Sequence, residues 1–341
     1  DAVLETDALC EAALCYTGDV TNSARPKYDI KYYVNMAKEL ERAGAHIIAI
    51  KDMAGICHPR AVRMLVKALR DEVGLPLHFH THDTSGIAAA SVLAAVEAGV
   101  DAVDGALDAL SGFTSQPNLG SIVAALSGSE RAAQVALTDL HGLSRYWEGV
   151  RRYYTAFEPE LRTGSSDVYH HEMPGGQYTN LREQARSVGI EHRWAEVCEA
   201  YAAVNMLFGD IVKVTPTSKV VGDMALFMVT NDLTPADVVD PQREIAFPES
   251  VVQMFRGELG FPPDGFPVAL QQKVLGGQPP LSGRAGDSMP PADFEQMRSE
   301  AESKIGRSLS DADLASWMMY PKVFQDYAAH AARYGDVSML P

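Results

Sequence analysis

The stretch LPLHFHTHDTSG, residues 75–86, places three histidines two residues apart at the end of an apolar run. Successive side chains of a β-strand point to opposite faces, so His78, His80 and His82 would share one face if this run is a strand. Imidazole is a common metal ligand, and two rings at this spacing can hold one cation. The alternative is a hydrogen-bonded stripe in the core, which requires partners for three polar rings. The stretch therefore indicates a cation site at a strand end and leaves the cation open.

The same pattern, an apolar run that ends in polar residues, recurs through the first 130 residues. The other runs are EAALCYTGD, AHIIAIKDMAG and AVDGALDAL, at 11–19, 45–55 and 102–110. Helical patterns lie between the runs, at 29–43, 59–71 and 86–99. This spacing is that of βα units that feed a parallel sheet, and the continuous apolar runs indicate strands buried on both faces.

These units predict an α/β fold, namely a TIM-type (β/α)₈ barrel of which only the last four βα units are present. A complete barrel needs eight strands and about 250 residues. A doubly wound sheet would also accept four units, but no strand is followed by the G-x-G-x-x-G phosphate turn of that class. Helical patterns dominate after residue 135. We therefore expect 1–135 to be the C-terminal half of a barrel domain and 136–341 to be a helical domain packed on the barrel mouth.

Composition narrows the class of protein. The 341 residues carry a net charge of −16, which argues against a nucleic-acid partner because such a surface is basic. No apolar run approaches the roughly 18 residues of a membrane span, so we expect a soluble protein with no membrane partner. The four cysteines show neither metal nor disulfide spacing. Reduced thiols are the default in a cytosol-like compartment. We expect a cytoplasmic location of bacterial type, with a mitochondrial matrix as the alternative.

Lys51 ends the run IIAIK and precedes DMAG, and two interpretations stay open. Its amine could form an ion pair with Asp52 or another carboxylate at the barrel mouth. Alternatively, the neutral amine could add CO₂ and become a carbamate, an anionic oxygen ligand for a divalent ion. Consecutive parallel strands would bring Lys51 to the same mouth as His80 and His82.

Two later segments carry polar side chains around turns. FGDIVKVTPTSKVVGD, at 208–223, is typical of a capped helix start, although Thr215 could relay a proton and Lys219 could hold an anion. HEMPGGQYTNL, at 171–181, predicts a tight turn at Gly175-Gly176, with Gln177 or Asn180 as a helix cap. We interpret this second segment as structural.

The combination of IIAIKDMAG, LHFHTHDTSG, GALDALSGFTSQPNLGSI, HEMPGGQYTNL and FGDIVKVTPTSKVVGDMA resembles the carboxyltransferase domain of biotin-dependent carboxylases. The TSQP segment and the terminal run SWMMYPKVFQDYAAHAARYGDVSMLP resemble the pyruvate carboxylase branch of that family. The resemblance covers essentially the whole chain, and its motifs are long and specific.

The resemblance implies a divalent metal, zinc or manganese, at the mouth of the barrel. Its ligands would include Lys51 as a carboxylated lysine, His80 and His82, with His78 one layer deeper in a structural role. For the reaction, the family pattern implies that a threonine in V-T-P relays a proton, and Thr215 occupies this position. Ser218 and Lys219 would flank a pocket for the biotin head group.

The family's R-D-x-x-Q motif, which supplies another metal ligand and contacts to pyruvate, is absent from this sequence. It belongs to the first four barrel strands, which are also missing from the strand count. We therefore expect a C-terminal portion of a longer carboxyltransferase domain. The implied activity moves CO₂ from carboxybiotin to pyruvate through a metal-stabilised enolate and forms oxaloacetate. We expect the isolated chain to be inactive and, because a half barrel exposes two strand edges and an apolar face, poorly soluble.

The resemblance also implies cofactors and partners outside this chain. Biotin would be carried on another domain, and ATP and bicarbonate would be used by a third. The partners would be pyruvate or oxaloacetate, the biotin carboxyl carrier and biotin carboxylase domains, and other copies in a homotetramer. Three alternatives stay open: the α subunit of an oxaloacetate decarboxylase or transcarboxylase, a metal-dependent lyase-type barrel with ordinary carboxylate ligands, and a non-catalytic fragment that acts only in assembly.

Overall fold

Four parallel strands form one sheet in chain order, β1-β2-β3-β4. Their bounds in this computed structural model, which describes residues 2–335, are Glu11–Cys15, Ile47–Asp52, Leu77–Thr81 and Ala102–Val103. Each strand lies beside the strand that precedes it in the sequence, as in an arc of a barrel. In a doubly wound sheet the strand order reverses partway across the sheet. The prediction of four βα units is confirmed. The fourth strand is shorter than the run 102–110, because Asp108–Leu110 forms a 3₁₀ turn instead.

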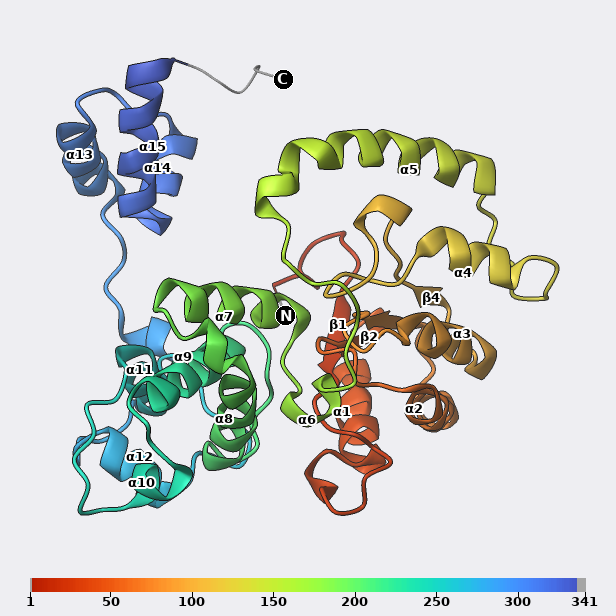
Figure 1. Ribbon diagram of the computed structural model, residues 1–341, viewed down its shortest axis with the longest axis horizontal. Helices are drawn as coiled ribbons and strands as arrows, with labels where there is room; N and C mark the ends of the chain where they lie inside the picture. Colours follow the sequence, from red (N-terminus) through yellow and green to blue (C-terminus); the bar gives the residue numbers. More distant parts are fainter. Residues whose placement is uncertain (1, 336–341) are drawn as a thin grey trace. The chain divides into compact units, whose positions relative to one another are not determined.

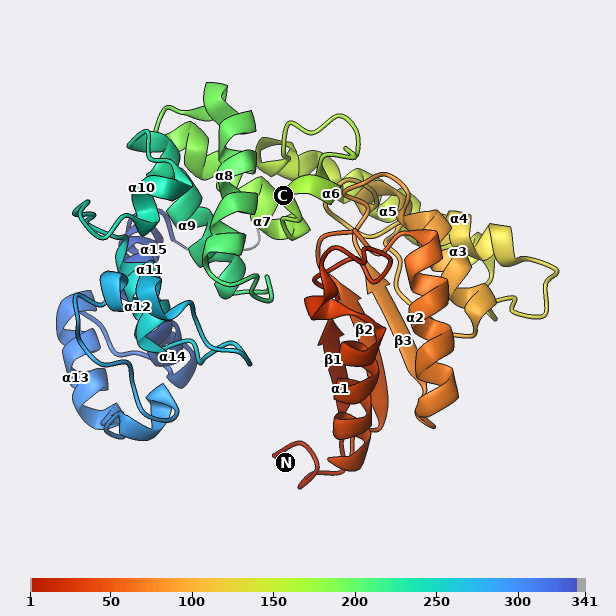
Figure 2. The ribbon, with the colours of Figure 1, turned by 90° about the horizontal axis from the view of Figure 1, so that it is seen from below.

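Three helices connect the strands and cover one face of the sheet (Figure 2). They are α1 (Ile30–Arg42), α2 (Pro59–Glu72) and α3 (Ala88–Ala98). Local signals in the sequence set their ends. The Asp29 carboxylate caps α1, Pro59 occupies the first turn of α2, and Gly99 closes α3 with a left-handed φ of 106°. Asp83 accepts a hydrogen bond from the Ala88 backbone N–H at 3.0 Å, which orients the start of α3.

The strand register decides which side chains share a face. Leu77, Phe79 and Thr81 alternate toward the helices and are buried. His78 and His80 therefore point to the other face, as the spacing predicts. Directly paired residues of a parallel sheet lie on the same face, and Lys51 is paired with His80. The sheet thus brings the candidate lysine and histidines to one side and one end.

The chain after β4 is helical (Figure 1). Its helices in the first unit are α4 (Leu119–Leu126), α5 (Leu137–Arg151), a 3₁₀ segment (Arg152–Phe157), α6 (Val168–His171), α7 (Gly175–Ser187), α8 (Trp194–Leu207), α9 (Thr217–Thr230), α10 (Pro235–Val239), α11 (Glu249–Arg256) and α12 (Val268–Val274). A second apolar core forms around α8 and α9, with Tyr201 and Phe255 fully buried. Val168 and Val212 pack with the core of the sheet, so the helical part is joined to the barrel half.

Contacts divide the chain into two units, Asp1–Ser282 and Gly283–Pro341. The predicted domain boundary between residues 135 and 136 stays a prediction. In the second unit, α13 (Phe294–Ile305), α14 (Asp311–Met319) and α15 (Pro321–Tyr334) enclose a small core that includes Trp317 and Phe324. The last six residues of the terminal run, at 336–341, lie outside the described residues. None of the described helices combines the length and hydrophobicity needed to cross a bilayer.

Candidate active site

His80 and His82 turn their Nε2 atoms toward each other at the end of β3. The two Nε2 atoms are 3.3 Å apart. Each Nδ1 lies 2.6 Å from an acceptor, the Asp104 carboxylate for His80 and the Thr114 carbonyl oxygen for His82. In neutral rings these contacts place the proton on Nδ1 and leave the Nε2 lone pair free. Two ligands about 2.1 Å from a zinc ion at a tetrahedral angle lie about 3.4 Å apart, so the pair fits a shared divalent ion.

Lys51 faces the same point from β2. It is paired with His80 in the sheet register and lines one cavity together with His82. Burial lowers the pKa of His82, and the neighbouring charges of His80 and Lys51 lower it further, so this imidazole stays available as a neutral ligand. Within residues 2–335 the Lys51 amine has no carboxylate within ion-pair distance, which removes the predicted pair with Asp52.

Asp52 instead holds the turn that follows Lys51. Its carboxylate accepts hydrogen bonds from the backbone N–H groups of Gly55, Ile56 and Cys57 at 3.0, 3.0 and 2.8 Å, and from the Thr81 hydroxyl at 2.7 Å. Burial raises the pKa of Asp52, and these hydrogen bonds oppose the shift. The turn after β2 is therefore tied to β3, which fixes Lys51 beside the histidines.

His78 lies one layer deeper and contacts carboxylates rather than the other two rings. Its Nδ1 is 3.1 Å from Glu11, and its Nε2 is 3.0 Å from the Asp104 oxygen that does not contact His80. Burial opposes charging of His78, but Asp104 and Glu11 outweigh it and raise the pKa. His78 thus orients Asp104, which orients His80. We did not predict Asp104, although it directly follows the apolar strand 102–103, as polar site residues do after the other strands.

A cavity of about 510 Å³ joins the barrel mouth to the helical part. Its lining includes Lys51, His82, Thr215 and Lys219, so four of the predicted site residues converge there. The remaining lining residues are Met53, Pro174, Gly176, Gln177, Asn180, Gln184 and Val214. His80 is not in the lining but contacts His82 directly. The other predicted contact, Ser218, is 2 % exposed and does not line the cavity.

Gln177 belongs to this cavity rather than to a helix cap. The residue before α7 is Pro174, and no side chain caps that helix. Gln177 is 9 % exposed, and its buried Nε2 has no hydrogen-bond partner among the described residues. A buried amide donor without a partner is costly, and this one lines the cavity, which makes Gln177 a candidate ligand contact. Our interpretation of Gln177 as a cap is wrong, because α7 begins two residues earlier and points this side chain inward.

The loop that carries Thr215 is closed by its neighbour Thr217. The Thr217 hydroxyl lies 2.6 Å from the Val214 carbonyl oxygen and 3.2 Å from the Val214 backbone nitrogen. The helix start predicted for this segment is confirmed, with α9 beginning at Thr217, but the predicted cap is wrong, because the N-cap residue is Pro216 and no side chain caps the helix. Thr215 is exposed and lines the cavity. The Lys219 amine donates a hydrogen bond to the Asp223 carboxylate at 2.7 Å.

Asp167, His171 and Cys198 also place potential metal ligands within 4.8 Å of one another. The His171 Nδ1 accepts the Met173 backbone N–H at 3.0 Å. Burial lowers the pKa of His171 to about 4, so the ring is neutral and its single proton lies on Nε2. In this tautomer neither nitrogen offers a free lone pair, so we assign no metal to this group.

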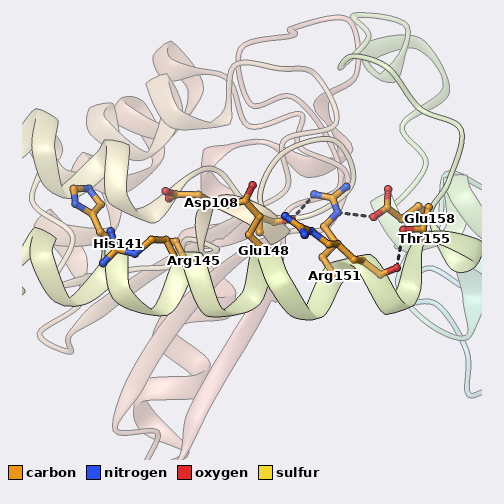
Figure 3. Close-up of a pocket in the computed structure, with 10 residues that line it drawn as sticks. Asp108, His141, Arg145, Glu148, Arg151, Thr155 and Glu158 are labelled. Atoms are coloured by element: carbon orange, nitrogen blue, oxygen red, sulfur yellow. Dashed lines mark hydrogen bonds and ion pairs between the residues drawn. The ribbon is translucent and has the colours of Figure 1, made fainter. Parts of the chain in front are cut away.

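A cavity of about 630 Å³ lies along α5 (Figure 3). Its charged side chains have mixed sign, and one pair is in contact: Arg151 lies 2.6 Å from Glu158 and also contacts the Ala109 carbonyl oxygen. None of the site residues predicted from the sequence lines this cavity, so we take the cavity that contains Lys51 as the candidate active site.

Sequence comparisons relate the whole chain to known proteins. The conserved carboxylase domain family matches residues 168–341, and the HMGL-like family matches residues 2–146. The chain is 48 % identical to pyruvate carboxylase of Bacillus subtilis and 45 % identical to the mitochondrial enzyme of Homo sapiens, over 100 % of this chain. It spans only 30 % and 29 % of those relatives.

Solved structures show the same likeness. The carboxyl transferase domain of Rhizobium etli pyruvate carboxylase, with pyruvate and biocytin, matches with a TM-score of 0.94 and 63 % identity. The match covers 100 % of this chain and 57 % of that domain. The complete multifunctional enzyme of the same organism matches with a TM-score of 0.93, over 33 % of its chain.

Proposed function

We propose a function from the premise that the chain belongs to the conserved carboxylase domain family and corresponds to part of the carboxyltransferase domain of pyruvate carboxylase. The proposed reaction transfers CO₂ from carboxybiotin to pyruvate and forms oxaloacetate. One observation carries the proposal: Lys51, His82 and Thr215, which lie far apart in the sequence, line a single cavity beside the paired Nε2 atoms of His80 and His82. The pyruvate and biocytin in the related Rhizobium etli structure support the choice of ligands.

The donor set fits a divalent ion, zinc or manganese. His80 and His82 would each contribute Nε2, and Lys51 would contribute an oxygen after its amine, which has no ion-pair partner within residues 2–335, adds CO₂. Such an ion supplies Lewis-acid stabilisation of the negative charge that develops on an enolate oxygen.

The chain's own residues would bind the biotin ring and move a proton. After carboxybiotin releases CO₂, the Thr215 hydroxyl gives its proton to the ureido nitrogen and takes one from the pyruvate methyl group. The resulting enolate carbon forms a bond to CO₂, and oxaloacetate is complete. The Gln177 amide and the Lys219 amine would donate hydrogen bonds to the ureido oxygen. Ser218, which the resemblance places near this pocket, would act through the start of α9, because its side chain is buried.

The experiment that tests this role is Thr215→Ala in the protein at its full natural length. General acid–base groups typically contribute about 10²- to 10⁴-fold, so we expect oxaloacetate formation to fall by at least about 100-fold. Bound metal should stay unchanged, because Thr215 is not a ligand. Thr230→Ala, at the exposed end of helix α9 that follows the Thr215 loop, is the matched control and should behave as wild type. Near-normal oxaloacetate formation by Thr215→Ala would remove Thr215 from the mechanism.

The rest of the proposal concerns the longer protein. Biotin would be delivered by a carrier domain, and ATP and bicarbonate would be used by a biotin carboxylase domain. The assembly would be a homotetramer in a cytoplasm of bacterial type. The present chain alone should form no oxaloacetate, because its cavity lacks the pyruvate contacts that the family places in R-D-x-x-Q. Measurable oxaloacetate formation by residues 1–341 alone would contradict this part.

A further inference from the structure

Four charged side chains form a buried cluster behind the cavity, which we call the Arg25 cluster: Arg25, Glu172, Asp210 and Lys213. Arg25 contacts Glu172 at 2.6 Å and Asp210 at 2.8 Å. Lys213 contacts the other oxygen of Glu172 at 3.0 Å. The Arg25 guanidinium therefore contacts two carboxylates that are 38 positions apart in the sequence. The Lys213 ammonium group is the second cation of the cluster.

The cluster is balanced in charge, and three of its side chains are shielded from water, whereas the Arg25 side chain is 31 % exposed. The cluster contains two cations and two anions, and the side chains of Lys213 and Glu172 are only 2 % and 9 % exposed. Glu172 and Asp210 increase the preference of Arg25 for its charged form, which outweighs the effect of burial. Buried charges are tolerated when they are paired, whereas removing one partner leaves the other unpaired in a low-dielectric site. Arg25 is thus the group whose loss would disturb both carboxylates at once.

The backbone at both carboxylates adopts an uncommon conformation. Glu172 and Asp210 each have a φ of 52°, in the left-handed region that non-glycine residues rarely occupy. Such a conformation persists only where its surroundings determine it. At Asp210, the Arg25 guanidinium and the Asn205 amide donate hydrogen bonds to the carboxylate, the amide at 2.9 Å. The Tyr28 hydroxyl donates a hydrogen bond to the Asp210 backbone carbonyl oxygen. Arg25 and Tyr28 come from the loop that follows β1, so this loop helps to set the path of chain segments far along the sequence.

These segments form two walls of the cavity. Glu172 precedes Pro174 by two residues, and Lys213 precedes Val214 and Thr215. The first wall also contacts the metal-site histidine, because a Cβ added at Gly175 would lie 3.0 Å from His82 Nδ1. None of the four charged residues lines the cavity itself. The Arg25 cluster therefore acts on the site only through the position of its walls.

We propose that Arg25 is a positioning residue of this site, which sets the distance between the Thr215 loop and the wall against His82. The assignment rests on the proposed function for its effect on catalysis, but its structural part stands independently. Displacing a reacting group by about 1 Å can cost about 100-fold in rate. Loss of Arg25 should lower kcat for carboxyl transfer and leave bound metal unchanged, because the metal ligands belong to the sheet.

The test uses Arg25→Met and Arg25→Lys in the protein at its full natural length. The matched control is Arg63→Met, which removes an exposed ion pair with Glu97. Hydrogen exchange is measured for residues 172–177, residues 210–217 and, as an internal reference, helix α2, which buries one face in the core of the sheet. We expect Arg25→Met to raise exchange in both walls by at least about tenfold and to leave α2 unchanged. It should lower kcat by at least about tenfold, with the pyruvate KM within about twofold of wild type.

Arg25→Lys should recover part of the effect, because one ammonium group can reach one carboxylate but not both. Arg63→Met should match wild type throughout. Unchanged exchange in both walls of Arg25→Met would overturn the proposal. An equal rise in α2 would also overturn it, since Arg25 would then support global stability rather than the site. If the wild-type protein formed no oxaloacetate, the proposed function would fail, while the exchange data would still decide the role of Arg25.

Discussion

At the scale of single residues, the histidines differ in the nitrogen that each leaves free. His80 and His82 direct Nδ1 to an acceptor and keep Nε2 open, whereas His171 uses Nδ1 as an acceptor and carries its proton on Nε2. Sequence spacing identified His80 and His82, because alternation along a strand is visible in the sequence. It could not identify Asp104 or Gln177, because their roles depend on contacts between distant parts of the chain.

Gly175 offers a sharp test of the histidine geometry. A Cβ at this position would lie 2.7 Å from the Thr114 carbonyl oxygen and 3.0 Å from His82 Nδ1, so Gly175→Ala must displace the ring or its acceptor. We expect zinc affinity to fall by about 10- to 100-fold, the usual cost of disturbing the partner of a metal-binding histidine. Titration with a competing chelator measures this affinity.

Gly176→Ala is the matched control, because the added Cβ meets no atom within 4 Å. It should retain the zinc affinity of wild type. Equal affinities for the two variants would show that the contact between Gly175 and His82 does not support the metal site.

At the scale of elements, the sequence predicted the strands and their crossover helices because each has a clear period and end signals. It missed α4 and recognised only the start of α9. Both helices are apolar around most of their circumference, and α9 buries residues on several faces, including Val220, Met224 and Met228. A helix with no polar face has no amphipathic period, so its pattern cannot be distinguished from that of a buried strand.

The hydrogen bond between the turn after β2 and strand β3 predicts that two buried threonines contribute differently to the free energy of unfolding. The Thr81 hydroxyl donates to Asp52 at 2.7 Å, whereas the buried Thr84 hydroxyl has no partner among residues 2–335. Thr81→Val should lower the free energy of unfolding by about 1.5–3 kcal/mol, the usual value of a hydrogen bond to a charged group. Thr84→Val should be neutral or stabilising. Urea denaturation measures both, and equal losses would contradict the assigned role of Thr81.

At the scale of the whole molecule, the sheet has two edges, β1 and β4, as expected for a partial barrel. The face turned away from the helices is more polar than predicted, since it carries Lys51, His78 and His80. Exposed aromatic side chains are frequent on α5 and the 3₁₀ segment that follows. Tyr146, Tyr153 and Phe157 are exposed there, Phe157 by 82 %. The sequence pattern alone could not locate this patch, because its residues are spaced like those of a buried helix.

This patch predicts association of the isolated chain. Large exposed apolar patches promote contacts between molecules, so residues 1–341 should form larger species as their concentration rises. Replacing both Tyr153 and Phe157 by Ser should reduce the association, whereas Val239→Ser, at an exposed apolar residue outside the patch, should not. Sedimentation velocity measures the distribution. A monodisperse monomer at all concentrations would contradict the prediction.

The most direct measurement is anomalous X-ray diffraction from crystals of the zinc-loaded protein at its full natural length. The account predicts an anomalous peak about 2.0–2.2 Å from Nε2 of both His80 and His82, with density beyond the Lys51 amine for a bound CO₂. A peak only at other residues, or a zinc ion at the histidines with Lys51 unmodified and turned away, would contradict the account.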